Sequence, residues 1–387
     1  MEKTTNAKDS AGYGYVDSAE GLALLIEALG GASRVSLDTE ADSLHHYFEK
    51  VCLIQLSFSG RNYILDPLAG FSLTGFFEIL SQKELILQGA DYDLRMLQKT
   101  FKFRPKAPIF DTMLAAQVLG YEKIGLAALV EKFFGVVLSK SGQKSDWSKR
   151  PLSAKQLCYA SDDTKYLEGI ANRLTAELQA LGRMAWHREC CERAIEISRL
   201  SAKSESKETW RIKGSSVLDP KELAFVRELW KWRDKEARKR DRPSFMILRN
   251  EDLIDLARKR AKGERELPTT LKRVSGEVLT CLESSIRIAE GLSPSEWPVP
   301  PERSRMREAA VSQEKVETLR DACKAIAEAS KIEPCFLASR AALAAVARHR
   351  PRSIETIMEV SGMMRWQAEL TMPAIQAVLN RGEERPL

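Results

Sequence analysis

Histidine and closely spaced cysteines are scarce in this chain. It has four histidines among 387 residues, and its seven cysteines contain no Cys-x-x-Cys pair. Structural zinc sites are built from such residues at short spacing, so their scarcity argues against one. The odd number and scattered positions of the cysteines predict reduced thiols instead of a disulfide framework.

Long apolar segments are absent as well. The sequence has no apolar run of about 18 residues that would span a membrane. The first residues, Met1 to Glu20, are polar and lack the apolar core of a secretory signal. We therefore expect a cytoplasmic protein without a membrane segment.

The excess of positive charge is small. The chain has 60 Lys and Arg residues against 54 Asp and Glu residues, which gives a net charge of +6 and a pI of about 8.8. This balance favours a polyanionic partner, but the distribution of the charges matters more than their total. A chain of 387 residues is long enough for two or three domains with ample cores.

Two carboxylates stand two residues apart near the start of the chain. Residues 35–40, Val-Ser-Leu-Asp-Thr-Glu, predict a strand, in which residues two apart project to the same face. Asp38 and Glu40 would then repel each other unless a cation or a proton lies between them. Carboxylate oxygens favour magnesium or manganese over zinc. An isolated Asp-x-Glu is more often a solvated strand edge, so this pair alone decides nothing.

A further acid lies on a helix that we predict at residues 156–167. Tyr159 and Asp163 are four residues apart, so they share one helix face. A phenol beside a metal-binding carboxylate can orient a water molecule and help to remove its proton, which is the chemistry of a hydrolytic site. Taken alone, such a pair is more often an ordinary contact between a helix and the core.

The middle acid follows a predicted buried strand and a glycine-containing turn within residues 85–97. Asp93 falls in the first turn of the next helix, and α/β proteins place ligands at helix N-termini that follow strands. We expect Asp91 to be the N-cap and Asp93 the ligand, because an N-cap side chain is occupied by backbone amides.

The order Asp-x-Glu, Asp and Tyr-x3-Asp resembles the tyrosine-bearing branch of the DEDD superfamily of 3′-to-5′ exonucleases. Further similar segments occur at residues 52–57, 110–115 and 145–152. Over about residues 15–180 the sequence resembles the ribonuclease D family. The resemblance implies an α/β exonuclease domain with a ribonuclease H-like fold, in which helices flank a mixed sheet.

The same resemblance assigns roles to individual residues. Thr39 and Gln88 are candidate contacts to nucleic acid, although family members often have His at the position of Gln88. The family also implies two divalent metal ions, Mg²⁺ or Mn²⁺, and a tyrosine that aligns the attacking water. The four metal ligands and this tyrosine are Asp38, Glu40, Asp93, Asp163 and Tyr159.

The second half of the chain changes character after a polar connector at residues 201–208. Helical periodicity replaces strand-like runs from about residue 218, and several segments resemble the HRDC domain, a small helical module. A weak internal repeat predicts a second copy, because Pro243-Ser244-Phe245 and the following helix are echoed from Pro334 onward. A proline-rich linker at residues 292–301 separates the copies. We expect an exonuclease domain at 1–200 and two all-α HRDC-like domains at 210–296 and 310–382.

Basic residues cluster in the first of these modules, interleaved with Trp230 and Trp232. Phosphate contacts from such a helix would add affinity without sequence choice. The alternative is a solvated helix face whose tryptophans point into the core. The candidate contacts to nucleic acid within residues 231–242 are Lys235, Arg238, Lys239 and Arg242.

The function that the resemblance implies is hydrolytic release of nucleoside 5′-monophosphates from the 3′ ends of single-stranded RNA, including tRNA precursors. A DNA 3′-to-5′ exonuclease with the same metal site is the first alternative, since no residue that senses a 2′-hydroxyl is identifiable. The second alternative is a catalytically silent RNA-binding scaffold. The five intact catalytic positions argue against this scaffold.

Overall fold

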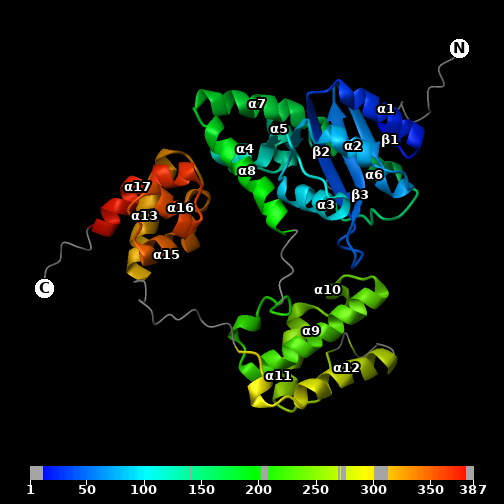
Figure 1. Ribbon diagram of the computed structural model, residues 1–387, viewed down its shortest axis with the longest axis vertical. Coiled ribbons are helices and arrows are strands. Elements are labelled where there is room, and N and C mark those ends of the chain that lie inside the picture. Colours follow the sequence, from blue (N-terminus) through cyan, green and yellow to red (C-terminus); the bar gives the residue numbers. More distant parts are fainter. Residues whose placement is uncertain are drawn as a thin grey trace. The chain divides into compact units, whose positions relative to one another are not determined.

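The computed structural model describes residues 12–139, 142–201, 208–268, 271, 276–299 and 313–380. These residues group into two compact units (Figure 1). The first contains the described parts of Met1–Ala41, Val51–Lys203 and Ala309–Leu387, and the second contains Asp42–Lys50 and the described part of Ser204–Glu308. The expected connector at 201–208 and the linker at 292–301 lie partly outside the described residues.

A mixed six-stranded sheet forms the centre of the first unit, as the sequence predicts. Its strand order is β1-β4-β3-β2-β5-β6. The antiparallel pairs are β2 with β3 and β3 with β4, whereas β1 runs parallel to β4 and β5 runs parallel to both β2 and β6. The strands are β1 (Gly14–Val16), β2 (Arg34–Ala41), β3 (Val51–Phe58), β4 (Arg61–Leu65), β5 (Glu84–Leu87) and β6 (Ile109–Asp111).

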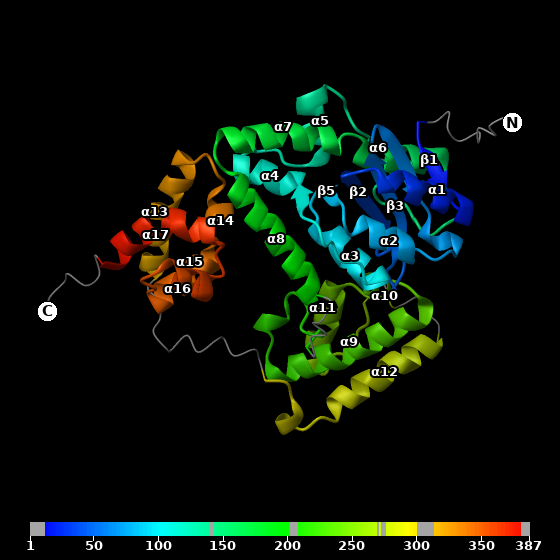
Figure 2. The same cartoon turned by 45° about the horizontal axis from the view of Figure 1, so that its top comes forward.

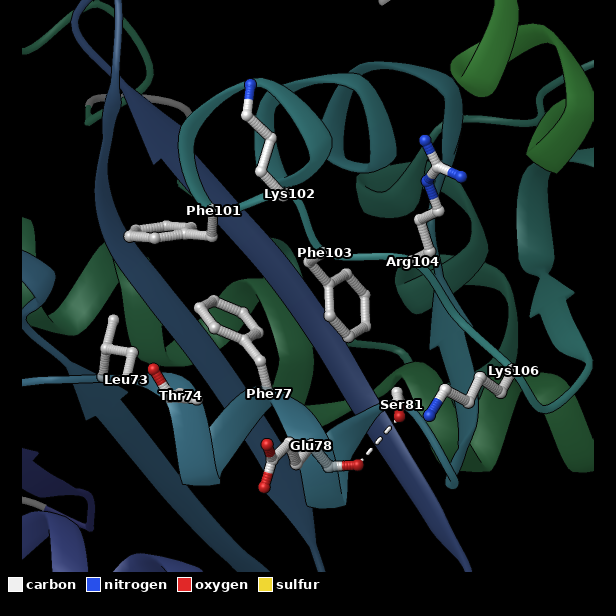
Figure 3. A pocket seen from close by; sticks show the side chains of 10 residues that line it. All are labelled: Leu73, Thr74, Phe77, Glu78, Ser81, Phe101, Lys102, Phe103, Arg104 and Lys106. Carbon is white, nitrogen blue, oxygen red and sulfur yellow. Dashed lines mark hydrogen bonds between the residues drawn. The ribbon is translucent and has the colours of Figure 1, made fainter.

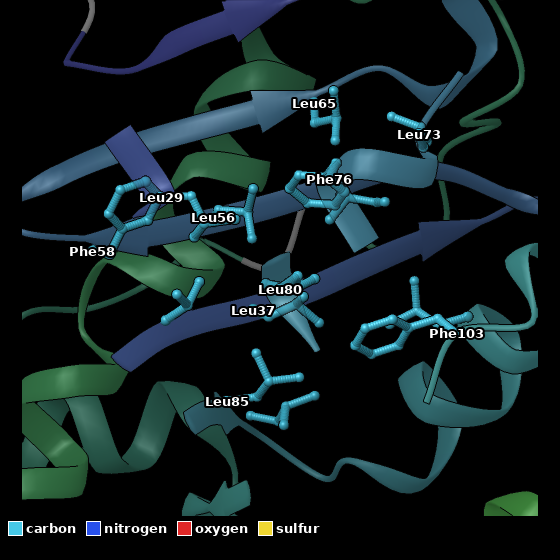
Figure 4. Packing of buried hydrophobic residues seen from close by; sticks show 14 of the residues in the cluster. Leu29, Leu37, Leu56, Phe58, Leu65, Leu73, Phe76, Leu80, Leu85 and Phe103 are labelled. Atoms are coloured by element: carbon cyan, nitrogen blue, oxygen red, sulfur yellow. The ribbon is translucent and has the colours of Figure 1, made fainter. Parts of the chain in front are cut away.

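One face of the sheet is covered by α1 (Ala19–Gly30), α2 (Thr74–Leu80) and α3 (Asp91–Phe101). Side chains alternate between the two faces of a strand, so the paired residues Leu37 and Leu56 both point to this side. Figure 4 shows them packed with Phe76 and Leu80 of α2. Because Leu37 faces the core here, its neighbours Asp38 and Ser36 must face the other side of the sheet.

The opposite face is covered by α6 (Ala154–Lys165). A capping box starts this helix, since the Ser153 hydroxyl accepts from the amide of Gln156 while the Gln156 side chain accepts from the amide of Ser153. The hydroxyls of Thr164 and Ser57 lie 2.6 Å apart, which ties the end of α6 to β3. The helix therefore crosses the side of β2 that carries Asp38 and Glu40.

The second helical module of the sequence belongs to the first unit. Its residues Ile332 and Trp366 share a hydrophobic cluster with helices that follow the sheet. The Trp366 ring stacks on Trp186 with centroids 4.8 Å apart, and Arg183 donates to the Ser330 carbonyl at 2.6 Å. The remaining helices of this unit, several of them labelled in Figure 2, are α4 (Thr112–Leu119), α5 (Leu126–Phe134), α7 (Leu167–Ala180), α8 (Met184–Ser201), α13 (Gln313–Ala329), α14 (Pro334–Leu337), α15 (Arg340–His349), α16 (Ile354–Ser361) and α17 (Arg365–Asn380).

The second unit combines the first helical module with the loop 42–50, which connects β2 to β3. The Tyr47 hydroxyl donates to Asp234 at 2.6 Å, and the amides of Tyr47 and Phe48 donate to Asp241 at 3.0 and 3.2 Å. The helices of this unit are α9 (Pro220–Arg240), α10 (Ser244–Ile247), α11 (Asn250–Ala261) and α12 (Gly276–Glu290). The internal repeat is visible in the structure, because α10 and α11 correspond to α14 and α15. Among the described residues, no helix has a stretch long and apolar enough to cross a membrane.

Candidate active site

Three carboxylates that are far apart in the sequence converge on one face of the sheet. Asp38 and Glu40 project from β2 toward α6, which carries Asp163. Each offers one oxygen, and the three oxygens lie within 4.8 Å of one another. The structure therefore brings together three of the four acids that the sequence singles out.

Asp93 lies close to this group but outside it. It is 4% exposed in the first turn of α3, and its carboxylate accepts a hydrogen bond of 2.5 Å from the Thr39 hydroxyl. Burial raises the pKa of the Asp93 carboxyl, and so does the negative charge of Asp38. Thr39, a predicted nucleic-acid contact, is seen here to orient Asp93.

The expected N-cap of α3 was wrong. Ala90 occupies this position, and Asp91 instead pairs with Arg95 at 3.0 Å one turn along the helix. In the turn before the helix, the amides of Gly89 and Ala90 donate to Asp111, with bonds of 3.0 and 2.7 Å. Asp111 thus fixes the turn that presents Asp93.

The site concentrates negative charge, and no basic side chain among the described residues forms an ion pair with Asp38, Glu40, Asp93 or Asp163. Burial, reinforced by the charge of Asp163, raises the pKa of Asp38 well above its ordinary range. Burial and the charge of Asp38 raise the pKa of Glu40 to about 10. Burial and the charge of Asp162 raise the pKa of Asp163 to about 7. Carboxyls in this condition either keep protons or bind a cation.

One oxygen of the group is suited to a cation in particular. Asp163 Oδ2 is buried and has no hydrogen-bond partner within the protein. An unsatisfied buried carboxylate oxygen is costly, and a hard divalent cation is the partner that carboxylate oxygens favour. The donor set therefore fits a divalent metal site.

Tyr159 lies one helical turn before Asp163 on α6, and its phenol lowers the pKa of the Asp163 carboxyl. Burial and the charge of Asp163 raise the pKa of the Tyr159 phenol, so this phenol is neutral near pH 7. Its ring packs near Trp147, with centroids 6.1 Å apart, and directly against Gly142. A rigidly held neutral phenol beside a metal ligand can orient water.

Two residues at the site, Asp111 and Gln55, were not identified from the sequence. Asp111 accepts from four backbone amides, and its place directly before a helix was a detectable N-cap signal. Gln55 is fully buried on β3 directly opposite Asp38, and neither atom of its amide has a partner within the protein. No local signal marks Gln55, because its role depends on the register between β2 and β3.

The other predicted nucleic-acid contacts are largely engaged within the protein. Gln88 donates to the Ile124 carbonyl at 2.8 Å and accepts from the Thr112 hydroxyl at 2.5 Å. These bonds hold the end of β5. Whether Gln88 also touches nucleic acid stays a prediction.

Much of the basic run on α9 is paired with acids of its own unit. Arg238 pairs with Asp234 at 3.1 Å, and Lys239 pairs with Glu277 at 2.7 Å. Trp230 and Trp232 pack into the hydrophobic core of the second unit. This agrees with the alternative that the basic run is a solvated helix face whose tryptophans point into the core. Lys235 and Arg242 are exposed, and they remain candidate contacts.

Comparison with known proteins supports both parts of the chain. Residues 13–179 match the family model described as 3′-5′ exonuclease, and residues 222–276 and 312–379 match the HRDC domain. Ribonuclease D of Pseudomonas paraeruginosa is 31% identical over 304 residues, which cover 74% of this chain and 79% of that protein. Ribonuclease D of Zymomonas mobilis is 32% identical over 294 residues, covering 73% and 74%.

Solved structures agree on the fold. A protein from Bifidobacterium adolescentis superposes with a TM-score of 0.80 at 24% identity, covering 95% of this chain and 97% of that one. RNase D of Escherichia coli, described as an exoribonuclease involved in structured RNA processing, gives a TM-score of 0.71 at 24% identity and covers 95% and 99%. At these identities the likeness shows a common fold.

Proposed function

This chain belongs to the ribonuclease D family and is a 3′-to-5′ exoribonuclease, and we propose that it acts on single-stranded 3′ ends, including those of tRNA precursors. The observation that carries this proposal is the convergence of Asp38, Glu40 and Asp163 beside Tyr159. Such a group suits phosphodiester hydrolysis, in which charge develops on the leaving oxygen. An RNA substrate of this kind would place the enzyme in the cytoplasm.

The proposed cofactor is a pair of divalent ions, Mg²⁺ or Mn²⁺. When bound, such ions lower the pKa of water and neutralise charge on the leaving oxygen. Asp38 would hold such an ion together with Glu40 and Asp163, because one oxygen of each lies within 4.8 Å of the others. The full proposed ligand set is Asp38, Glu40, Asp93 and Asp163.

Residues of the chain position the metal ligands and the attacking water. Thr39 holds the Asp93 carboxylate in place, and Asp111 holds the turn before it. The neutral Tyr159 phenol orients the attacking water toward the scissile phosphate. The water oxygen bonds to phosphorus as the bond between phosphorus and the 3′-oxygen of the preceding nucleotide breaks. The water proton passes to solvent or to a neighbouring carboxylate, and the leaving 3′-oxygen takes up a proton from solvent.

Matched RNA and DNA strands with a 3′ label test the proposal. Purified protein with Mg²⁺ or Mn²⁺ should release labelled nucleoside 5′-monophosphate from RNA, and EDTA should stop the release. Asp38→Asn should lower the rate on the order of a thousandfold while leaving the circular dichroism spectrum unchanged. Preferential hydrolysis of DNA would favour the DNA exonuclease. RNA binding without any hydrolysis in either metal would favour the scaffold.

A further inference from the structure

An aromatic hollow lies between α2 and the end of α3 in the first unit. Its volume is about 370 Å³. Figure 3 shows the rings of Phe77, Phe101 and Phe103 gathered at its centre. The Phe77 ring lies 4.8 Å from that of Phe101 and 5.2 Å from that of Phe103, centroid to centroid. Phe77 and Phe101 are half-buried, so part of this aromatic surface faces the hollow.

Three cations surround these rings. Lys102, Arg104 and Lys106 are exposed and line the hollow (Figure 3). The described part of the chain places no carboxylate in ion-pair contact with them. Glu78 is the one acid among the residues that line the hollow. This surface is therefore positive, in contrast to the paired basic run on α9.

The segment that carries the cations is held in a fixed shape. The amides of Lys106 and Ala107 donate to the Ser81 carbonyl at 2.8 and 3.1 Å. Arg104 Nε donates to the Gln98 side chain at 2.9 Å. The backbone of this segment and the Arg104 side chain are thus held beside the rings, which lowers the entropy lost when a ligand binds.

The hollow and the acidic site share α3. Asp93 lies in the first turn of this helix and Phe101 is its last residue. At 1.5 Å per residue, the two Cα atoms are about 12 Å apart along the helix axis. The hollow lies on the α2 and α3 side of the sheet, whereas Asp38 and Glu40 face α6 on the other side. A strand whose 3′ end lies at these acids would therefore pass around the start of α3 at Asp93 before its upstream nucleotides reach the hollow.

We propose that this hollow binds an upstream nucleotide of single-stranded RNA, with a base against Phe77 and Phe101 and phosphates at Lys102, Arg104 and Lys106. Aromatic faces beside cations are the chemistry by which proteins hold single strands without sequence preference. The proposal rests on the proposed exoribonuclease function and adds a contact outside the acidic site.

Charge removal in the full chain gives the first test. Lys102→Gln, Arg104→Gln and Lys106→Gln combined should raise KM for a long oligoribonucleotide on the order of tenfold, with kcat nearly unchanged. The salt dependence of binding should flatten by about two units for three lost phosphate contacts. A dinucleotide cannot reach the hollow, so its kcat/KM should stay at the wild-type value.

A matched variant controls for net charge. Lys123→Gln, Arg188→Gln and Arg348→Gln remove three exposed cations far from the hollow in sequence, and they should leave the salt slope within error. Equal effects of both triple variants would overturn the proposal. Wild-type hydrolysis of the dinucleotide separately tests the exoribonuclease function, so a failure of that function is distinguishable.

Photocrosslinking tests the base contact directly. Single-stranded RNA with 5-iodouridine at successive positions, bound to full-length Asp38→Asn protein, should crosslink to Phe77 or Phe101 from upstream positions and not from the 3′ end. Mass spectrometry of the peptides identifies the residue. Crosslinks confined to other segments, or charge variants that lose affinity only for free nucleoside 5′-monophosphate, would overturn the assignment to RNA.

Discussion

Gly142 limits the position of the Tyr159 phenol, which we propose to orient the attacking water. A Cβ atom at this glycine would meet Tyr159 Cβ and Cδ1 at 2.8 Å and Cγ still closer. Gly142→Ala should therefore displace the ring and lower kcat on the order of a hundredfold. Steady-state kinetics on a short RNA measures this, and calorimetry should show metal binding retained. Gly125→Ala, where a Cβ meets nothing within 4 Å, is the control and should change kcat little.

Replacing Gln55 should change the stability of the metal-free protein and its affinity for metal in opposite directions. Its amide is buried without a partner, which costs about 1–3 kcal/mol in the metal-free fold. Gln55→Met keeps the length of the side chain and removes that cost, so the metal-free protein should melt at a higher temperature. Because Gln55 lies opposite Asp38, the same variant should bind Mn²⁺ more weakly. A lower melting temperature in EDTA would show that the amide is satisfied in solution.

The raised pKa values of the buried acids determine how the stability of the metal-free protein changes with pH. The pKa of Glu40 is raised from 4.5 to about 10, and that of Asp163 from 3.8 to about 7. Above pH 4.5 the unfolded chain has lost these protons while the folded chain still holds them. The free energy of unfolding of metal-free protein should therefore fall as pH rises, by up to about 1.4 kcal/mol per pH unit for each proton.

Divalent metal should reverse this trend, because it binds the ionised carboxylates. Thermal unfolding with and without Mn²⁺ should show a larger metal-induced shift at pH 8 than at pH 6. Asp38→Asn should reduce that difference. A shift that is the same at both pH values would contradict the raised pKa values.

At the scale of elements, Arg150 holds the segment that precedes α6 in position. Its Nη2 donates to Asp66 at 2.7 Å and to the Cys52 carbonyl at 2.8 Å, and its Nη1 donates to the Trp147 carbonyl at 2.7 Å. Burial would raise the pKa of Asp66, but the bonds from Arg150 and Tyr15 outweigh it and lower this pKa. The segment before α6 is thus tied to β3 and to the end of β4.

Arg150→Lys should loosen that tie. Lysine cannot make the planar two-point pair with Asp66, so the free energy of unfolding should drop by about 1.5–3 kcal/mol. Because α6 carries Tyr159, kcat should fall more than KM rises. Lys149→Met removes a neighbouring cation that is 79% exposed and should leave both constants unchanged. An unchanged kcat in Arg150→Lys would show that α6 is positioned by its core contacts alone.

Local periodicity was sufficient to predict the elements that carry the acids. A spacing of two on β2 and of four on α6 places each pair on one face, and neither spacing depends on distant residues. The partners of Asp111 and Gln55 depend on which strands are neighbours, which periodicity does not reveal. Asp111 is 21 residues from the amide of Ala90 that it satisfies, so periodicity does not reveal this contact either.

At the scale of the molecule, the sequence suggested a catalytic domain that ends near residue 200. In the structure, the second helical module packs within the first unit, where Trp366 is 3% exposed. Trp366→Ala should cost about 3–5 kcal/mol of unfolding free energy. A fragment ending near Leu200 should show a similar loss in thermal unfolding. Trp297→Ala, at a half-buried tryptophan of the second unit, should cost less.

Each of the two units combines segments that are far apart in the sequence, and this sets the order in which the units can form on the ribosome. The second unit needs loop 42–50, which is made long before α9, and the first needs Trp366, which is made about 180 residues after Trp186. At about 5–20 residues per second, this second interval lasts about 10–40 s. During this time the face of α8 that carries Trp186 and later meets Trp366 is exposed to water. The nascent chain is therefore most vulnerable to aggregation and proteases just before α17 (Arg365–Asn380) emerges, and a premature stop before Trp366 would leave it in that state.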